Sequence, residues 1–466
     1  MKDMKFTILN GSPKGAESVT MQYVLYIKKR HPEHEYNIIN IAQAIKKIEN
    51  DEKRFEDIIL QIKESDGVIW GFPLYVMLVC SQYKRFIELI TERNAEAAFE
   101  NKYTIVLSTS IHFYDHTAQN YMQSICDDLK MKYVGNYPAD SWDLLYPKRR
   151  ARWLLFIEEF INHIEHKYPT SKHYAPLKMR DFKYTPGKAI EDSEKCDTLG
   201  KKILVVSDET NENTNIGKMI KRFAESFSSE IEIINLYDID VKGGCISCLQ
   251  CGYDHKCSYI GKDGFFEFWE DVVMTSDILV FAGVIKDRYL SSRWKMVLDR
   301  AFYMTHTPTL TGKQMGYLIS GPVNQIPNLS QMFQAHIEIQ DSNFVDIITD
   351  EFGTSEDIDA LLHDFARKLV TFSKTDYIKP MTFLGEGGKK IFRDDIYGRN
   401  RFVFLADHEY YEKHGFYDTF PQNDVRAKKL NEKLIPLMRI DKLRNKINMK
   451  QEFLRPFMKV LEDPNK

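Results

Sequence analysis

The chain has 466 residues, of which 43% are hydrophobic and 28% are charged, so its composition is that of an ordinary globular protein. Its formal net charge of −3 gives no electrostatic basis for binding nucleic acid or an anionic membrane surface. The amino-terminal residues show no signal-peptide pattern, and the longest apolar stretch, 68–80, is too short to span a bilayer. We therefore expect a cytoplasmic protein with no membrane partner.

The predicted elements form two similar series along the chain. The paired strands are 5–9 and 202–206, 36–41 and 231–236, 65–72 and 276–283, and 104–108 and 315–319, and the paired helices are 21–30 and 216–227, and 84–88 and 295–299. Lys5 and Lys202 lie 197 positions apart and Ser65 and Ser276 lie 211 apart, so the series align with one net insertion of 14 residues in the second. Short apolar strands that alternate with helices predict an α/β fold with two tandem doubly wound parallel sheets, each a three-layer α/β/α arrangement.

Composition changes divide the chain into four predicted segments. They are a first domain at 1–165, a linker at 166–199, a second domain at 200–375 and a carboxyl-terminal helical and aromatic extension at 376–466. Pro169, Pro176 and Pro186 interrupt the polar linker. The extension is too rich in aromatic residues to be disordered, and its helical patterns continue to Val460. We expect it to pack on a domain or on a partner subunit.

The loop after the first strand has the features of an anion site. It contains Gly11, Ser12, Pro13, Lys14, Ser18 and Thr20. A loop that joins the carboxyl end of a strand to a helix presents backbone N–H groups and a positive dipole end to an anion. The hydroxyl groups add donors and Lys14 adds charge. The loop lacks the glycine and lysine spacing of ATP-binding and dinucleotide-binding loops. Taken alone, Ser18 or Thr20 is also a typical helix N-cap.

Three loops in chain order together resemble the NADPH-dependent FMN reductases. The first is the loop just described, the second is Phe72, Pro73, Leu74, Tyr75 and Val76 with Lys84 downstream, and the third is Ser108, Thr109, Ser110 and His112. The resemblance implies two flavodoxin-like domains, roughly 5–165 and 200–372. It implies that Ser12, Lys14, Ser18 and Thr20 hold the FMN phosphate and that Pro73 to Val76 lie along the isoalloxazine edge. NAD(P)H as electron donor and a homodimer are further implications.

The second series departs from this pattern at its own first loop, 207–214. Asp208, Glu209 and Glu212 there would repel a phosphate unless they point away from it. Its second loop, 284–287, lacks the proline of the first series. We expect a degenerate repeat that serves a structural role rather than a second flavin site.

Four cysteines lie close together in the interval that holds the insertion. They are Cys245, Cys248, Cys251 and Cys257. Three cysteines at two-residue spacing are typical of cluster ligation, whereas zinc usually takes two separated knuckles. The arrangement resembles the iron–sulfur flavoproteins, which implies a 4Fe-4S cluster with all four as ligands. Zinc and thiol-redox or vestigial cysteines remain alternatives. Cys80 and Cys126 are isolated and are expected to be buried small apolar residues.

The resemblance implies an enzyme that passes electrons from NAD(P)H through FMN to an acceptor, either a small molecule such as a flavin or quinone, or an iron–sulfur centre or protein. No catalytic acid or base is predicted, because hydride transfer needs none. The alternatives are a non-enzymatic flavin or iron–sulfur electron carrier, and a redox or metal sensor built on the cysteines. His112, Asp115 and His116 form an acid–base or metal group, line the flavin loop, or face solvent. The aromatic residues of the extension cover a flavin face or pack together; they are Tyr410, Tyr411, Phe416, Tyr417 and Phe420.

Overall fold

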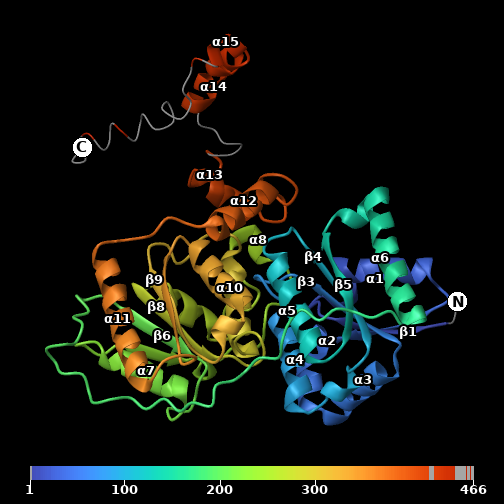
Figure 1. The fold of residues 1–466 in the computed structure, drawn as a ribbon, viewed down its shortest axis with the longest axis horizontal. Coiled ribbons are helices and arrows are strands. Elements are labelled where there is room, and N and C mark those ends of the chain that lie inside the picture. Colours follow the sequence, from blue (N-terminus) through green and yellow to red (C-terminus); the bar gives the residue numbers. More distant parts are fainter. Residues whose placement is uncertain (1–2, 419–424, 445, 447–457, 459–461, 463–466) are drawn as a thin grey trace. The chain divides into compact units, whose positions relative to one another are not determined.

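The computed structural model describes residues 3–418, 425–444, 446, 458 and 462. The chain forms two compact units, Met1–His408 and Glu409–Lys466, and the first unit contains both repeats (Figure 1). Within the described residues, no helix is both long enough and apolar enough to cross a membrane.

The first repeat is a parallel sheet with the strand order β2-β1-β3-β4-β5. Its strands are β1 (Lys5–Asn10), β2 (Glu35–Asn40), β3 (Gly67–Pro73), β4 (Tyr103–Ser110) and β5 (Lys132–Asp140). Its helices are α1 (Val19–Arg30), α2 (Ile41–Asn50), α3 (Glu52–Glu64), α4 (Ser81–Glu92), α5 (Asp115–Asp128) and α6 (Pro147–His166). Every residue of β4 is buried, as expected of a central strand with helices on both faces.

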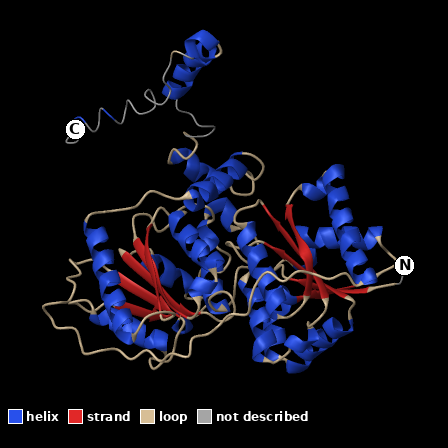
Figure 2. Cartoon of the chain, viewed as in Figure 1, coloured by secondary structure: helices blue, strands red, loops and turns tan. Residues whose placement is uncertain are grey.

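The second repeat has the same order read from its other edge, β10-β9-β8-β6-β7, and all its pairings are parallel. Its strands are β6 (Ile203–Ser207), β7 (Glu232–Asn235), β8 (Ile278–Val284), β9 (Gln314–Ser320) and β10 (Asn343–Thr349). Its helices are α7 (Asn215–Glu225), α8 (Cys251–Asp254), a π-helical turn at Glu267–Val273, α9 (Ser292–Ala301), α10 (Pro327–Glu338) and α11 (Ser355–Lys374). The predicted tandem flavodoxin-like fold is confirmed (Figure 2).

One face of each sheet is covered by the first and last helices of its repeat. In the first repeat, Trp153 of α6 is fully buried and its indole N–H donates to the Tyr23 carbonyl of α1 at 3.2 Å. In the second repeat, Phe223 of α7 and Phe365 of α11 lie 5.6 Å apart between ring centres, over the apolar strands β6 and β8. The two repeats therefore have equivalent cores on this face of each sheet. The helices on the other face of each sheet make the contact between the repeats.

The repeats contact each other through equivalent helices, α4 with α9 and α5 with α10. The Ser81 backbone N–H donates to Asp299 Oδ2 at 2.7 Å, and the Ser292 backbone N–H donates to Glu88 Oε1 at 2.6 Å. Ser81 and Ser292 are equivalent in the repeat, and so are Glu88 and Asp299. Reciprocal bonds of this kind are the mark of an isologous contact, here made inside one chain.

Two equivalent buried lysines complete this contact. Lys84 Nζ lies 3.0 Å from Glu88 Oε1 and 2.8 Å from Asp287 Oδ2. Lys295 pairs with Asp299, and its ammonium donates to the Tyr75 carbonyl at 3.0 Å. Burial raises the pKa of Asp299 and outweighs the neighbouring ammonium. For Glu88, burial is outweighed by Lys84 and the Ser292 hydrogen bond, so the pKa of that carboxyl is lowered.

The segment between α6 and β6 contains no helix and no named strand, and all of it is described. It is held at both ends of its course. The backbone N–H groups of His173 and Tyr174 donate to Asp127 Oδ2 of the first repeat. The Tyr184 backbone N–H donates to Asn215 Oδ1 of the second. The predicted linker is therefore packed along the first unit rather than free.

The extension begins with α12 (Phe383–Tyr397), which packs on α10. Phe392 of α12 stacks on Phe113 of the first repeat with ring centres 3.8 Å apart. The Arg399 guanidinium holds Asp140 with two bonds of 2.9 and 3.0 Å. Asp407, fully buried, accepts from His255 at 2.9 Å and interacts with His306 at 2.7 Å. The extension up to His408 thus joins both repeats.

Helix α13 (Leu405–Lys413) crosses into the second unit, which also contains α14 (Val425–Met438) and α15 (Asp441–Arg444). In that unit the rings of Tyr411 and Phe416 stack with centres 4.6 Å apart, so this part of the aromatic run packs on itself. Phe420 and the helical pattern near Val460 lie outside the described residues.

Candidate functional site

The three predicted flavin loops meet at the carboxyl ends of β1, β3 and β4. The hydroxyl oxygens of Thr20 and Thr109 lie 2.7 Å apart, which joins the first loop to the third. The Leu74 backbone N–H donates to the Thr109 carbonyl at 3.0 Å, which joins the second loop to the third. The Gly11 N–H donates to the Gly71 carbonyl at 2.7 Å. Three segments separated in sequence therefore form one continuous surface.

The first loop presents donors toward an anion. Ser18 caps α1, because its hydroxyl accepts from the Met21 N–H at 3.2 Å, so the N-cap interpretation holds for this residue. The N–H groups of the first helical turn, at Val19 and Thr20, have no intrahelical acceptor. Ser12 is fully buried and its hydroxyl accepts from the Lys14 N–H at 3.2 Å. Within the described residues, the half-buried Lys14 ammonium makes no hydrogen bond or ion pair.

This donor set suits a phosphate. It combines helix-terminal amides, buried hydroxyls and one ammonium that no carboxylate neutralises, and such groups bind anions through charge and dipole together. The acidic side chain within the loop, Glu17, is exposed. Pro13 closes the loop without adding an N–H group.

The second loop contains a tight turn held by two bonds. The Tyr75 N–H donates to the Leu78 carbonyl at 2.8 Å, and the Leu78 N–H donates to the Tyr75 carbonyl at 2.9 Å. Its central residues, Val76 and Met77, have φ values of 36° and 66° although neither is glycine. Left-handed conformations of bulky residues cost of order 1–3 kcal/mol each and concentrate at binding sites. Phe72 is buried, and the residues from Pro73 to Val76 are half-buried.

The third loop is divided between packing and the site surface. Ser108 is fully buried and accepts a hydrogen bond from the Gln119 amide, so its side chain serves the strand–helix packing. Ser110 accepts from the His112 N–H at 2.9 Å. His112 has a φ of 67°, and its Nδ1 lies 2.8 Å from Asp115 Oδ2. The hydrogen bond that His112 donates to the Asp115 carboxylate raises the pKa of the half-exposed His112 imidazole.

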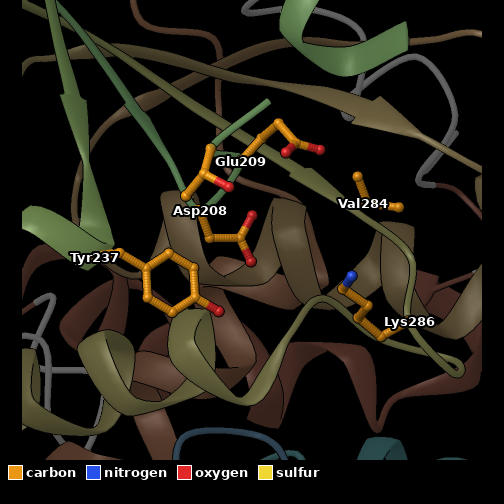
Figure 3. A pocket seen from close by; sticks show the side chains of 6 residues that line it. Asp208, Glu209, Tyr237, Val284 and Lys286 are labelled. Carbon is orange, nitrogen blue, oxygen red and sulfur yellow. The ribbon is translucent and has the colours of Figure 1, made fainter. Parts of the chain in front are cut away.

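The equivalent place in the second repeat has the opposite chemistry. Asp208 and Glu209 stand where the first repeat has Gly11 and Ser12. Asp208 is held by the Ser291 hydroxyl, and burial raises the pKa of its carboxyl. The two carboxylates line a pocket of ≈ 370 Å³ (Figure 3). The other lining residues are Thr210, Tyr237, Val284 and Lys286. Facing carboxylates make this pocket unsuited to a phosphate.

The cysteine segment lies against the second flavin loop. The Gln82 side-chain amide donates to the Cys245 carbonyl at 2.9 Å, and the Tyr75 hydroxyl lies beside Cys245 and Ser247. A Cβ added to Gly244 would lie 2.2 Å from the Ser81 hydroxyl oxygen, so only glycine fits this approach. The insertion that distinguishes the repeats is therefore in contact with the candidate site.

The predicted 4Fe-4S ligand set is not supported. Over the described parts of the chain, no group of three or more histidine, cysteine, aspartate or glutamate side chains is placed to hold a metal ion. Burial raises the pKa of the Cys245 thiol to about 11 and that of the Cys251 thiol to about 12. Cys248 is exposed and its thiol contacts the Ser258 hydroxyl at 3.5 Å. Cys80 and Cys126 are buried as expected.

Several residues at the site were not singled out from the sequence. Asp287 holds Lys84, and the Tyr121 hydroxyl donates to the same carboxylate at 3.0 Å. Asp140 pairs with Arg399 from the distant extension. Of these contacts, the sequence could have predicted only those of the two lysines. Lys84 and Lys295 are each followed four residues later by a carboxylate, a spacing that forms ion pairs on a helix.

Comparison with known proteins gives one family match and several similar solved structures. Residues 4–142 match the family model described as NADPH-dependent FMN reductase. No curated protein matches the chain. Among solved structures, an NADH:FMN oxidoreductase in its apo form is 15% identical, with a TM-score of 0.29, and the match covers 34% of this chain and 88% of that one.

Two further structures are similar at the same level. An FMN-dependent NADH-azoreductase from Bacillus anthracis is 13% identical with a TM-score of 0.27, over 35% of this chain and 99% of that one. The flavoenzyme NAD(P)H:(acceptor) oxidoreductase from Paracoccus denitrificans is 15% identical with a TM-score of 0.29, over 35% and 98%. The three flavin loops lie inside the range that the family model matches. The match confirms the resemblance for the first repeat, where residues 4–142 match the NADPH-dependent FMN reductase family, a family of oxidoreductase enzymes.

Proposed function

We propose that the first repeat binds FMN and that the chain oxidises NAD(P)H and passes the electrons to an acceptor. The observation that carries the proposal is the union of the three loops through Thr20, Leu74 and Thr109, at the sheet edge where doubly wound folds bind ligands. The family match over the same residues supports it.

In this proposal the first loop holds the phosphate. The amides at the start of α1, the Ser12 and Thr20 hydroxyls and the Lys14 ammonium are the donors, and Ser18 keeps the helix end in place. The turn at Tyr75–Leu78 and the backbone of Thr109 and Ser110 border the ring. When bound, FMN supplies hydride and single-electron chemistry, and the chain supplies position and charge.

His112 is the titratable group that we place at the edge of the proposed ring site. Asp115 orients its imidazole through Nδ1 and leaves Nε2 to act as a donor. An imidazolium at this edge favours negative charge on whatever it faces, which is the charge that reduction of a flavin ring develops. We assign His112 the role of an electrostatic partner rather than a proton-transfer catalyst.

The test is anaerobic reconstitution of the full chain with FMN, followed by addition of NADPH or NADH. We expect one FMN per chain with a dissociation constant below the high micromolar range, and rapid loss of the flavin absorbance with at least one nicotinamide. A chain that fails to retain FMN contradicts the whole proposal. Flavin that binds but resists NAD(P)H favours the electron-carrier alternative.

The cysteine segment supports a second candidate, a redox or metal sensor. The observation in its favour is the contact of Cys245 and Ser247 with Tyr75, which sets one of the four thiols beside the loop proposed to border the flavin. Iron, sulfide, zinc and free-thiol content of anaerobically prepared protein separates the possibilities. Iron and sulfide in equal amounts indicate a cluster, zinc indicates a metal site, and all seven cysteines titrating as thiols in denatured, metal-free protein indicate thiol chemistry.

The acceptor and the oligomeric state belong to the proposal as well. We propose a small-molecule acceptor such as a flavin or quinone, with an iron–sulfur centre or protein as the alternative. Homodimerisation stays a prediction. The contact of α4 and α9 pairs two domains within one chain in the isologous manner of a dimer. Sedimentation equilibrium of the holoprotein distinguishes monomer from dimer.

A further inference from the structure

A cleft of ≈ 640 Å³ lies between the two repeats. One wall is α2 and α4 of the first repeat, and the other is the start of α9 with the residues around the first cysteine, Lys242, Gly243, Gly244 and Ile246. The cleft begins at Pro13 of the first flavin loop and ends at Tyr237 and Lys286, which also line the pocket of Figure 3. Its volume is that of small-molecule sites, which are roughly 300–1,000 Å³.

The carboxylates of this cleft are neutralised within it. Arg85 pairs with all three of them, at 2.7 Å to Glu49, 3.1 Å to Glu88 and 2.6 Å to Glu92. Glu88 also accepts from the buried Lys84. These groups form a closed network, so they neither attract a cation nor strongly repel an anion.

Three cations of the cleft, Lys46, Lys286 and Arg293, form no ion pair with a carboxylate in the part of the chain that the structure describes. Arg293 spends its donors on the backbone carbonyls of Leu236 and Ile239, and Lys46 donates to the Lys242 carbonyl. The Lys286 side chain makes no hydrogen bond or ion pair within the described residues, and Asp208 acts on it through charge alone. A cleft with unpaired cations raises the local concentration of anions. Lys242 has its own partner, Asp240, at 2.8 Å.

The uncharged lining includes an apolar part beside the polar residues Gln43, Ser81, Gln82, Ser291 and Ser292. The Tyr237 ring is 57% exposed, and the Arg293 guanidinium lies 5.5 Å from its centre. Tyr259, Ile45, Ile246 and Met296 complete the surface. Aromatic and aliphatic walls of this kind bind planar rings through buried apolar area.

We infer that this cleft binds an anionic aromatic molecule, with its ring against Tyr237 and the apolar wall and its negative group facing Lys46, Lys286 and Arg293. The inference rests on the proposed function, because Pro13 connects the cleft to the flavin loop. Two sources share this chemistry. One is the adenine nucleotide part of the nicotinamide donor, and the other is an aromatic acid that accepts electrons.

The test is calorimetric titration of the full chain with two probes, adenosine 2′,5′-bisphosphate and anthraquinone-2-sulfonate. We expect the wild type to bind at least one probe, and the double charge reversal Lys46→Glu with Lys286→Glu to weaken that binding by about tenfold or more. The matched control is Lys53→Glu with Lys221→Glu, two exposed lysines on α3 and α7 that do not line the cleft. Binding of the nucleotide alone assigns the cleft to the donor, and binding of the sulfonate alone assigns it to the acceptor.

The inference is overturned if neither probe binds the wild type, or if both double variants bind equally well. A separate FMN titration of each variant keeps this result apart from the proposed function. If the wild type does not bind FMN, the flavin proposal is wrong. If it binds FMN but neither probe, only the inference about the cleft is wrong.

Discussion

The two repeats share their strand order and differ at each loop where a ligand would bind. The first loop of the first repeat offers amides, hydroxyls and Lys14, whereas the second repeat has Asp208 and Glu209 at the positions of Gly11 and Ser12. In the third loop, the His112–Asp115 pair is replaced by Val323 and Ile326. The two repeats therefore share a fold but differ in the side chains that could bind a ligand. A fold alone does not determine function, because function depends on the side chains placed on it.

The second repeat nevertheless takes part in the site of the first. Its insertion occupies the chain interval where the first repeat has α2, and it brings Cys245 and Ser247 to Tyr75. Its Lys295 donates to the Tyr75 carbonyl from inside the contact. A domain that no longer resembles a flavin binder thus supports the second loop of the domain that does.

The largest expected effect comes from the paired lysines of the contact. Asp299→Ala leaves Lys295 buried without a carboxylate, and loss of a partner from a buried ion pair costs about 3–5 kcal/mol of unfolding free energy. Glu88→Ala, the equivalent change, leaves Lys84 with Asp287 at 2.8 Å, so we expect a smaller loss of about 1–3 kcal/mol. Urea denaturation of both variants measures the difference. An equal or larger loss for Glu88→Ala would contradict the asymmetry described for the two lysines.

The next effect concerns the phosphate loop. Ser18→Asp keeps an N-cap side chain on α1 but adds a negative charge, and like charges in contact cost several kcal/mol. We expect FMN to bind about 100-fold more weakly or worse, measured by quenching of flavin fluorescence. The matched control is Thr214→Asp, because Thr214 caps α7 in the second repeat and accepts from the Gly217 N–H at 3.1 Å.

We expect Thr214→Asp to bind FMN as tightly as the wild type. If this control weakens binding as much as Ser18→Asp does, the flavin lies in the second repeat or the effect is one of folding. Unchanged binding in Ser18→Asp would show that the first loop does not hold the phosphate.

The repeat made most of the fold predictable from the sequence. Strands such as 5–9 and 65–72 are short and apolar because they are buried on both faces, and this local property survives without any knowledge of the neighbours. The constant offset of 211 then paired the helices at 84–88 and 295–299, which the structure places in contact. Local patterns and their repetition thus carried the architecture.

The site was predictable only where a loop pattern is local. The first and second loops were found as runs, but the packing role of Ser108 depends on Gln119, eleven residues away on the next helix. The ion pair of Asp140 and Arg399 joins residues 259 positions apart, and no periodicity relates them. The spacing of the cysteines suggested a cluster because spacing alone does not report burial or side-chain direction.

The smallest effect we predict is on the His112–Asp115 pair, which the second repeat lacks. The hydrogen bond to Asp115 raises the pKa of His112, so Asp115→Asn should lower that pKa, measured by NMR titration of the imidazole. The stabilisation from a raised imidazole pKa is present in full below the unfolded value and is lost as the pH rises through the folded value. Wild type and variant should therefore differ in stability at pH 5.5 and converge above pH 8. Because the imidazole is half-exposed, the difference should stay below about 1 kcal/mol. Asp143→Asn removes a carboxylate that acts on His112 by charge alone, so its shift should be much smaller, and an equal shift would show that the hydrogen bond to Nδ1 is not the cause.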